Sequence, residues 1–186
     1  MLHVGTMEHL IRGVREAVAS ECWYAALSLG LMIPDACAAI ESPGPNVGER
    51  YRVWTDTWLG PHVTLSGSRF LNGGELYRLR CRFLHEGTFC VDRQRTASED
   101  RNAAMFEALN EFNLFAGEVV PSRNMVRTAE GSRVYYSVAV ADLCEWICLA
   151  AEAWLLHARR NADHDSAIER RSRIFLIDLD GSRFEV

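Results

Sequence analysis

Apolar residues recur at intervals of three and four through the first half of the chain, the spacing of helices that bury one face. Stretches rich in glycine, proline and polar residues separate these runs, and we expect loops at 42–48 and 62–70. The pattern predicts four helices: one from Thr6, one from Trp23 through Ile40 with a kink or a fresh start at Pro34, one over Glu49–Leu59, and one over Glu75–Glu86 that ends at Gly87.

The fourth predicted helix has a narrow apolar stripe. Leu76, Leu79 and Phe83 stand at positions i, i+3 and i+7, so we expect them to face the core. Three arginines and a histidine take the remaining faces of the same helix. This helix therefore presents positive charge on a scaffold that the core holds in place.

The second half of the chain has a different period, and its segments are predicted in a fixed order. We expect extended chain at 112–120, 124–127 and 133–138, a long helix at 141–160, a charged linker at 161–173, and a terminal β-hairpin from 174–179 and 183–186. The sum is a mainly α protein. Residues 1–160 are expected to form a helical bundle with a small antiparallel β insertion at about 112–138, on which 161–186 packs as linker and hairpin.

The composition fits one folded domain and narrows the partners. With 186 residues, 48% apolar and 24% charged, the chain falls outside the disordered and collagen-like classes. A net charge of -5 means that the surface as a whole does not attract nucleic acid or an anionic membrane. All 20 basic residues are arginine, which we interpret as codon bias, although each guanidinium suits a carboxylate or a phosphate.

Cysteine spacing and the apolar stretches favour a reduced, cytoplasmic protein. The six cysteines show no C-x-x-C pair, so we expect neither disulfides nor a zinc site. Met1–Gly13 lacks the apolar core of a signal peptide. Leu143–Leu156, interrupted by Glu145 and Glu152, falls short of the roughly 20 residues of a membrane span. We therefore expect no membrane association.

The stretch most suited to chemistry is Tyr77–Gly87, in which Arg80 and His85 form the pattern R-x4-H. Arg78 and His85 form R-x6-H and fall on nearly the same helix face at about 100° per residue. Arg80 lies about 140° from His85, a separation that a long guanidinium stem can span. Histidine transfers protons near neutrality, and arginine stabilises charge on a pentacoordinate phosphorus. The pair suits RNA cleavage by the 2′-hydroxyl, which requires no metal.

Around this motif the chain resembles the HEPN superfamily, helical bundles whose hallmark is R-x4-6-H on a late helix. The resemblance extends over roughly the first 155 residues and points to a bacterial and plasmid-borne branch. The similar blocks are Tyr24-Ala-Ala-Leu27, Pro34-Asp35, Glu49-Arg-Tyr51 with Trp54 and Trp58, Leu79-Arg-Cys81, Leu84-His-Glu-Gly87, and Val138–Trp154 as the last helix.

The resemblance implies a metal-independent endoribonuclease of toxin or defence type, active as a homodimer without a cofactor. Arg80 would bind or stabilise the scissile phosphate, and His85 would be the general acid and base, in a cleft shared by two copies. Arg78 and Arg82 are candidate substrate contacts, or else solvated residues. Cys81 also falls at the substrate site, where active members commonly carry a polar residue, often asparagine.

A purely structural interpretation of the same residues stays open. Arg80 can bridge Glu75 or Glu86, and a protonated His85 can stabilise the end of its helix through the helix dipole. Under that interpretation the chain is a noncatalytic binding or adaptor module of HEPN fold for RNA, a nucleotide or a cognate protein. Asp163-His-Asp165 suggests metal ligands, but a charged linker explains it, and no metal site is expected.

Overall fold

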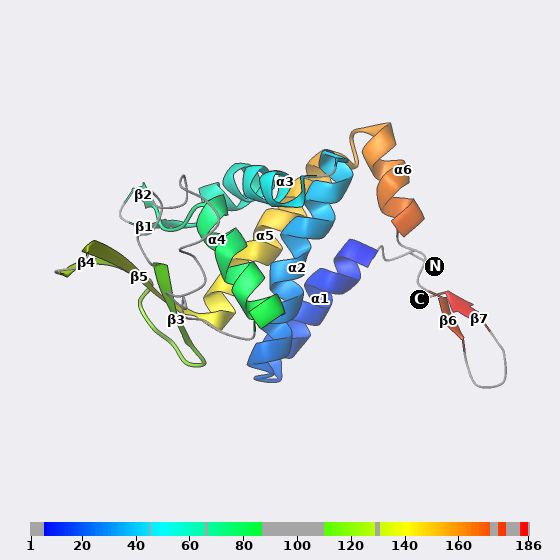
Figure 1. Ribbon diagram of the computed structural model, residues 1–186. Helices are drawn as coiled ribbons and strands as arrows, with labels where there is room; N and C mark the ends of the chain where they lie inside the picture. The colour runs from blue at the N-terminus through cyan, green and yellow to red at the C-terminus, as the bar shows by residue number, and fades with distance from the viewer. Residues whose placement is uncertain are drawn as a thin grey trace.

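The computed structural model describes most of the chain and is mainly helical, which confirms the predicted fold class (Figure 1). Gly87, the predicted end of the fourth helix, lies outside the described part. The described residues are 6–44, 46–65, 67–86, 110–128, 131–171, 175–177 and 183–185.

Three helices form the centre of the bundle. They are α1 (Thr6–Ala19), α2 (Trp23–Glu41) and α5 (Val140–Ala158), which pack against one another and share one continuous core. α1 buries one stripe, whereas α2 and α5 are apolar around most of their circumference because other elements cover them on several sides. The large residues fully buried on α2 and α5 include Leu27, Leu31, Leu143, Ile147 and Trp154.

Pro34 lies inside α2, and the helix continues through it without a fresh start. Its ring nitrogen carries no hydrogen and cannot donate to the carbonyl of Gly30, one turn earlier. The neighbouring carbonyl, that of Leu31, accepts a hydrogen bond of 3.3 Å from the buried hydroxyl of Tyr51. The proline turn of α2 is therefore tied to the helix that carries this tyrosine.

That helix, α3 (Val47–Trp54), begins two residues earlier than predicted. The side chain of Asn46 accepts a hydrogen bond from the backbone N–H of Glu49 and so caps the helix. A π turn, η1 (Thr55–Leu59), and a 3₁₀ turn, η2 (Gly60–His62), extend the helix. A two-stranded hairpin of β1 (Thr64–Leu65) and β2 (Ser68–Arg69) follows where a loop was predicted.

The predicted fourth helix is α4 (Gly73–Cys81), which continues as a π turn, η3 (Arg82–Glu86). Asn72 and Glu75 form a reciprocal capping box at its start. Gly73 lies so close to α3 that an added Cβ would come within 2.3 Å of the carbonyl oxygen of Arg52. Glycine at this position therefore lets α4 approach α3. The predicted core face is confirmed by the burial of Leu76, Leu79 and Phe83.

The β insertion is a three-stranded sheet of order β3–β5–β4. Its strands are β3 (Asn110–Phe115), β4 (Ser122–Thr128) and β5 (Gly131–Ala139). β4 pairs antiparallel with β5, as expected of strands that follow one another, but β3 runs parallel to β5. The sheet is thus mixed and not purely antiparallel. β5 leads directly into α5, which places the sheet at one end of the bundle (Figure 1).

The predicted charged linker is wrong over most of its length, because 162–171 forms helix α6 (Ala162–Arg171). The side chain of Asn161 accepts hydrogen bonds from the backbone N–H groups of Asp163 and His164 and so starts the helix. Ile168 is the residue of this helix that is buried in the hydrophobic core. One such residue is too few for a periodic pattern. The terminal hairpin is confirmed as β6 (Phe175–Ile177) paired antiparallel with β7 (Arg183–Glu185).

One helix of the described residues, α2, is long and apolar enough to cross a membrane. Half of that stretch is buried inside the bundle, as is usual for the core helix of a folded domain. By length and composition, the candidate membrane span among the described residues is therefore α2, and not residues 143–156, the stretch considered in the sequence.

Candidate functional site

Arg80 forms an ion pair with Asp35 of α2. Its Nη2 lies 2.5 Å from Oδ2 of Asp35. Only 16% of the Arg80 side chain and 21% of the Asp35 side chain are exposed. Every side chain in the other ion pairs between described residues is at least 32% exposed. A pair drawn this far from water carries a desolvation cost, so it marks a candidate site.

The ring of Tyr77 lies beside this ion pair. The guanidinium carbon of Arg80 is 5.9 Å from the centre of the ring, and that of Arg52 is 5.7 Å from it. Tyr77 in turn contacts the ring of Tyr51, with centroids 5.4 Å apart. Cation–π contacts of this kind favour one orientation of the arginine. The aromatic pair thus connects Arg80 to the tyrosine that supports the proline turn of α2.

Cys81 is a free, half-buried thiol beside the same arginine. Its Sγ lies 4.0 Å from Nη1 of Arg80. Burial raises the pKa of Tyr77, and a hydrogen bond with Cys81 raises it further. Cys81 therefore takes part in the polar cluster, which now consists of Asp35, Tyr77, Arg80 and Cys81 and is called the Arg80 cluster below.

The Arg80 cluster holds one fixed positive charge and one unsatisfied acceptor. Burial lowers the pKa of Arg80, but the charge of Asp35 and the contact with Cys81 outweigh it and leave the pKa above its ordinary value. Oδ1 of Asp35 is buried and has no hydrogen-bond partner among the residues that the structure describes. Buried acceptors are normally satisfied, so this unpaired oxygen distinguishes the cluster from an ordinary structural ion pair.

Asp35 did not enter the sequence-based site, although a signal for it exists. It is the only charged residue between Trp23 and Ile40, in a run that is otherwise apolar or small. A lone acid in a buried helix requires a cation or a hydrogen-bond donor nearby. The sequence does not reveal which arginine supplies it. The predicted bridge from Arg80 to Glu75 is not found, because the two oxygens of Glu75 accept from other groups and the described carboxylate at Arg80 is that of Asp35. The side chain of Glu86, the other predicted partner, lies outside the described residues.

His85 has its backbone in η3, five residues after Arg80. A π turn closes with hydrogen bonds between residues five apart, and such turns occur often at functional sites. The side chain of His85 lies outside the described residues. The structure therefore assembles the arginine half of the predicted motif and leaves its histidine half a prediction.

The flanking arginines, Arg78 and Arg82, are both half-buried. Each makes at least one polar, ring or electrostatic contact. Neither is a fully solvated surface residue, which was one of the two interpretations of their position. Their role as substrate contacts stays a prediction.

A second buried polar chain holds the start of α4. The hydroxyl of Tyr136 in β5 donates to Oε1 of Glu75, whose other oxygen accepts from the backbone N–H of Asn72 at 2.7 Å. Arg123 of β4 donates to the same hydroxyl at 3.2 Å. Burial raises the pKa of Tyr136 to about 12, with a further contribution from Glu75. These contacts fix α4 to the sheet, and the Arg80 cluster lies at the other end of the same helix.

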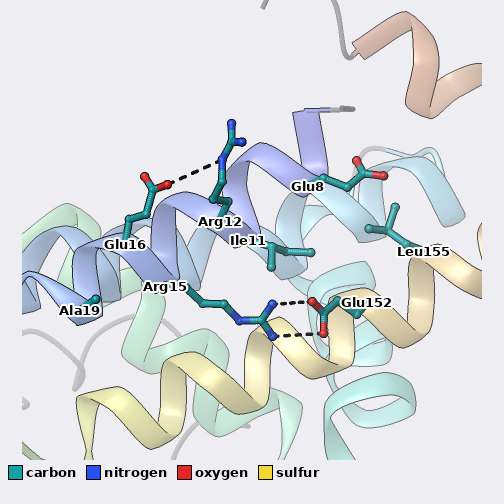
Figure 2. Close-up of a pocket in the computed structure, with 8 residues that line it drawn as sticks. All are labelled: Glu8, Ile11, Arg12, Arg15, Glu16, Ala19, Glu152 and Leu155. Atoms are coloured by element: carbon teal, nitrogen blue, oxygen red, sulfur yellow. Dashed lines mark hydrogen bonds and ion pairs between the residues drawn. The ribbon is translucent and has the colours of Figure 1, made fainter. Parts of the chain in front are cut away.

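A third polar region lies between α1 and α5, beside a cavity of about 430 Å³ (Figure 2). Arg15 binds Glu152 through bonds of 2.6 and 3.1 Å and Glu145 through bonds of 2.8 and 3.0 Å. Figure 2 shows the two terminal guanidinium nitrogens, Nη1 and Nη2, directed at the Glu152 carboxylate. All three side chains are 40% or more exposed. This region joins two helices, and its charges are already paired.

Within the described ranges, no group of three or more histidine, cysteine, aspartate or glutamate residues is arranged to hold a metal ion. This includes Asp163 and Asp165, which lie on α6. No family model, no curated protein and no solved structure matches the chain significantly. The HEPN resemblance therefore stays a prediction from the sequence.

Proposed function

We propose that the protein is a metal-independent endoribonuclease of HEPN type, with its chemistry at the Arg80 cluster and His85. The observation that carries the proposal is the half-buried Arg80–Asp35 pair, which directs a permanent cation to a fixed place next to an unsatisfied carboxylate oxygen. Fixed charge in a partly dehydrated site is what stabilises a phosphorane-like transition state most strongly.

Arg80, Asp35 and His85 each have a role in this reaction. Arg80 stabilises the negative charge that develops on the phosphoryl oxygens, and Asp35 positions Arg80 through their ion pair. His85 removes the proton of the RNA 2′-hydroxyl and returns a proton to the leaving 5′-oxygen. The bond from the 2′-oxygen to phosphorus forms as the bond to the 5′-oxygen breaks, which leaves a 2′,3′-cyclic phosphate.

The proposed biological form is a cytoplasmic homodimer that acts as a toxin or in defence. In the HEPN arrangement, two motifs face one groove, so one copy supplies half of the substrate contacts. A dimer at tens of micromolar, a concentration at which obligate dimers commonly persist, is the expected result of light scattering. A monomer under those conditions contradicts this part of the proposal.

The test is cleavage of total RNA by the purified protein in EDTA. Wild type is expected to cleave and to leave cyclic phosphate ends, and His85→Ala is expected to lower the rate by about 10²–10⁴-fold. His62→Ala is the matched control, because His62 is an exposed histidine on η2 outside the cluster. Arg80→Ala should also lower the rate, whereas Arg127→Ala on the exposed part of β4 should not. Equal rates for His85→Ala and wild type contradict the mechanism.

A second candidate function is a noncatalytic module that binds RNA, a nucleotide or a cognate protein. Two observations favour it: Asp35 already neutralises Arg80, and a thiol occupies the position after the arginine. Cys81→Asn separates the two candidates. In an active enzyme the substitution changes the rate little, and in a degenerate site it raises the rate. Absence of cleavage by both wild type and Cys81→Asn, on structured and single-stranded RNA, leaves the binding module as the function.

A further inference from the structure

An aromatic pocket lies at the η3 end of α4, beyond the Arg80 cluster. Its volume is about 470 Å³, which is within the range of small-molecule sites. The start of α2, the η3 end of α4 and the edge strand β3 surround it, and Figure 1 shows the end of α4 beside the start of α2. Its aromatic lining consists of Trp23, Tyr24, Phe83, Phe112 and Phe115.

Tyr24 is the feature that the core does not explain. Its side chain is stacked on Phe83, with ring centroids 5.8 Å apart and an angle of 20° between the planes. Phe83 is buried, but Tyr24 is 73% exposed. One face of the tyrosine is therefore fixed by a buried ring while most of the residue is in water. A rigid aromatic platform of this kind is typical of sites that stack planar ligands.

The pocket also has a polar side and a charged neighbour. Asn113, an exposed residue of β3, contributes an amide that both donates and accepts hydrogen bonds. Arg80 stands three residues before Phe83 on the same continuous helix, and its guanidinium is held at Asp35, about three turns along α2 from Tyr24. Stacking surface, amide and cation are the three contacts that a strand of several nucleotides uses through a base face, a base edge and the phosphate of a nearby nucleotide.

We propose that this pocket receives an unpaired nucleobase of a single-stranded RNA whose phosphate lies at the Arg80 cluster. The inference rests on the proposed RNA function and names its substrate class as single-stranded. Tyr24 stacks on the base, and Asn113 binds its edge. The cation of Arg80 and the amide of Asn113 favour this occupant over an apolar peptide or an apolar face of a second copy. Such a partner would contact the aromatic wall and use neither polar group.

The test uses a fluorescein-labelled 2′-O-methyl RNA of about ten nucleotides, which lacks the attacking hydroxyl, and a strand of equal length that is abasic throughout. Fluorescence anisotropy is expected to show tighter binding of the base-containing strand. Tyr24→Ala should weaken that binding by about 10-fold, the equivalent of about 1.4 kcal/mol, to near the level of the abasic strand. Tyr24→Phe should bind as wild type does. Leu156→Ala is the control for an exposed residue elsewhere, since Leu156 is 70% exposed on α5.

The results separate this inference from the ribonuclease proposal. Equal binding by Tyr24→Ala and wild type overturns the pocket, as does equal wild-type binding of the two strands or binding of neither. If wild type cleaves RNA and Tyr24→Ala cleaves it with the same KM, the pocket proposal is contradicted while the ribonuclease proposal stands. If Tyr24-dependent binding occurs without any cleavage, the pocket stands and the ribonuclease fails. A dimer that dissociates in Tyr24→Ala assigns the pocket to a second copy and overturns the proposal.

Discussion

Arg15 and Arg80 each join two helices through carboxylates, yet their surroundings differ. Arg15 contacts Glu145 and Glu152 with four hydrogen bonds, at a position where its side chain is 40% exposed. Arg80 has Asp35 as its described carboxylate partner and is 16% exposed. Arg15 thus has two carboxylate partners at an exposed site, whereas Arg80 is half-buried beside a carboxylate with one unsatisfied oxygen.

The difference indicates which arginine is the better candidate for a ligand contact. Hydrogen bonding to Glu145 and then Glu152 raises the pKa of Arg15, and binding an anion there would require displacement of two carboxylates. At Arg80 burial is the largest influence and lowers the pKa, whereas the charge of Asp35 and the contact with Cys81 raise it above its ordinary value. The comparison therefore supports the role proposed for Arg80 and indicates a structural role for Arg15.

The largest expected effect tests whether the helix of Arg80 is fixed by the core. Phe83→Ala removes a ring that is 8% exposed, and the cavity should lower the free energy of unfolding by about 3–5 kcal/mol. Chemical denaturation followed by circular dichroism measures it, with Leu156→Ala as the exposed control. An unchanged midpoint for Phe83→Ala would show that η3 is not packed as the structure has it.

A smaller effect tests the far end of the same helix. Tyr136→Phe removes the donor to Glu75 and leaves a buried carboxylate oxygen unpaired, which should lower the free energy of unfolding by about 1–3 kcal/mol.

The wild-type protein should also lose stability as the pH rises from about 10 to 12. Over this range the unfolded tyrosine ionises, while burial keeps the folded one, with a pKa of about 12, protonated. Tyr136→Phe should flatten this alkaline slope, and an unaltered slope contradicts the assignment.

The Arg80 pair itself is tested by a double-mutant cycle. Arg80→Ala, Asp35→Ala and the double variant should give a coupling of about 1–2 kcal/mol, below that of a fully buried pair because both side chains retain some exposure. Asp35→Asn is a useful third variant, because it keeps the shape of the side chain. If RNA cleavage falls in Asp35→Asn while stability changes little, Asp35 positions the arginine. A coupling near zero would remove the contrast with Arg15.

How far the sequence predicts these features depends on whether the information is local. The helices with regular apolar stripes were predicted, since burial of Leu76, Leu79 and Phe83 follows from their spacing. The parallel pairing of β3 with β5 was not, because strand order depends on contacts between distant segments. α6 was missed for a different reason, since Ile168 alone makes no periodic stripe.

The candidate site shows the same limit. R-x4-H is a local pattern and directed attention to Arg80, which the structure places in a polar cluster. The partner Asp35 lies 45 residues earlier in the chain, and its pairing depends on how α2 and α4 pack. The bonds of Arg15 to α5 span at least 130 residues and have no local signature at all.

The smallest expected effect concerns those exposed bonds. A double-mutant cycle of Arg15→Ala with Glu152→Ala should give a coupling of about 0.2–1 kcal/mol, since exposed pairs exchange most of their attraction for that of water. Glu152→Ala alone should cost less than Arg15→Ala, because Glu145 still holds the arginine. Raising the salt from about 0.1 to 1 M shortens the screening length from about 10 to 3 Å and should reduce this coupling more than that of Arg80 with Asp35. Equal salt dependence of the two cycles would mean that water reaches both pairs alike. The burial difference that supports the role proposed for Arg80 would then be contradicted.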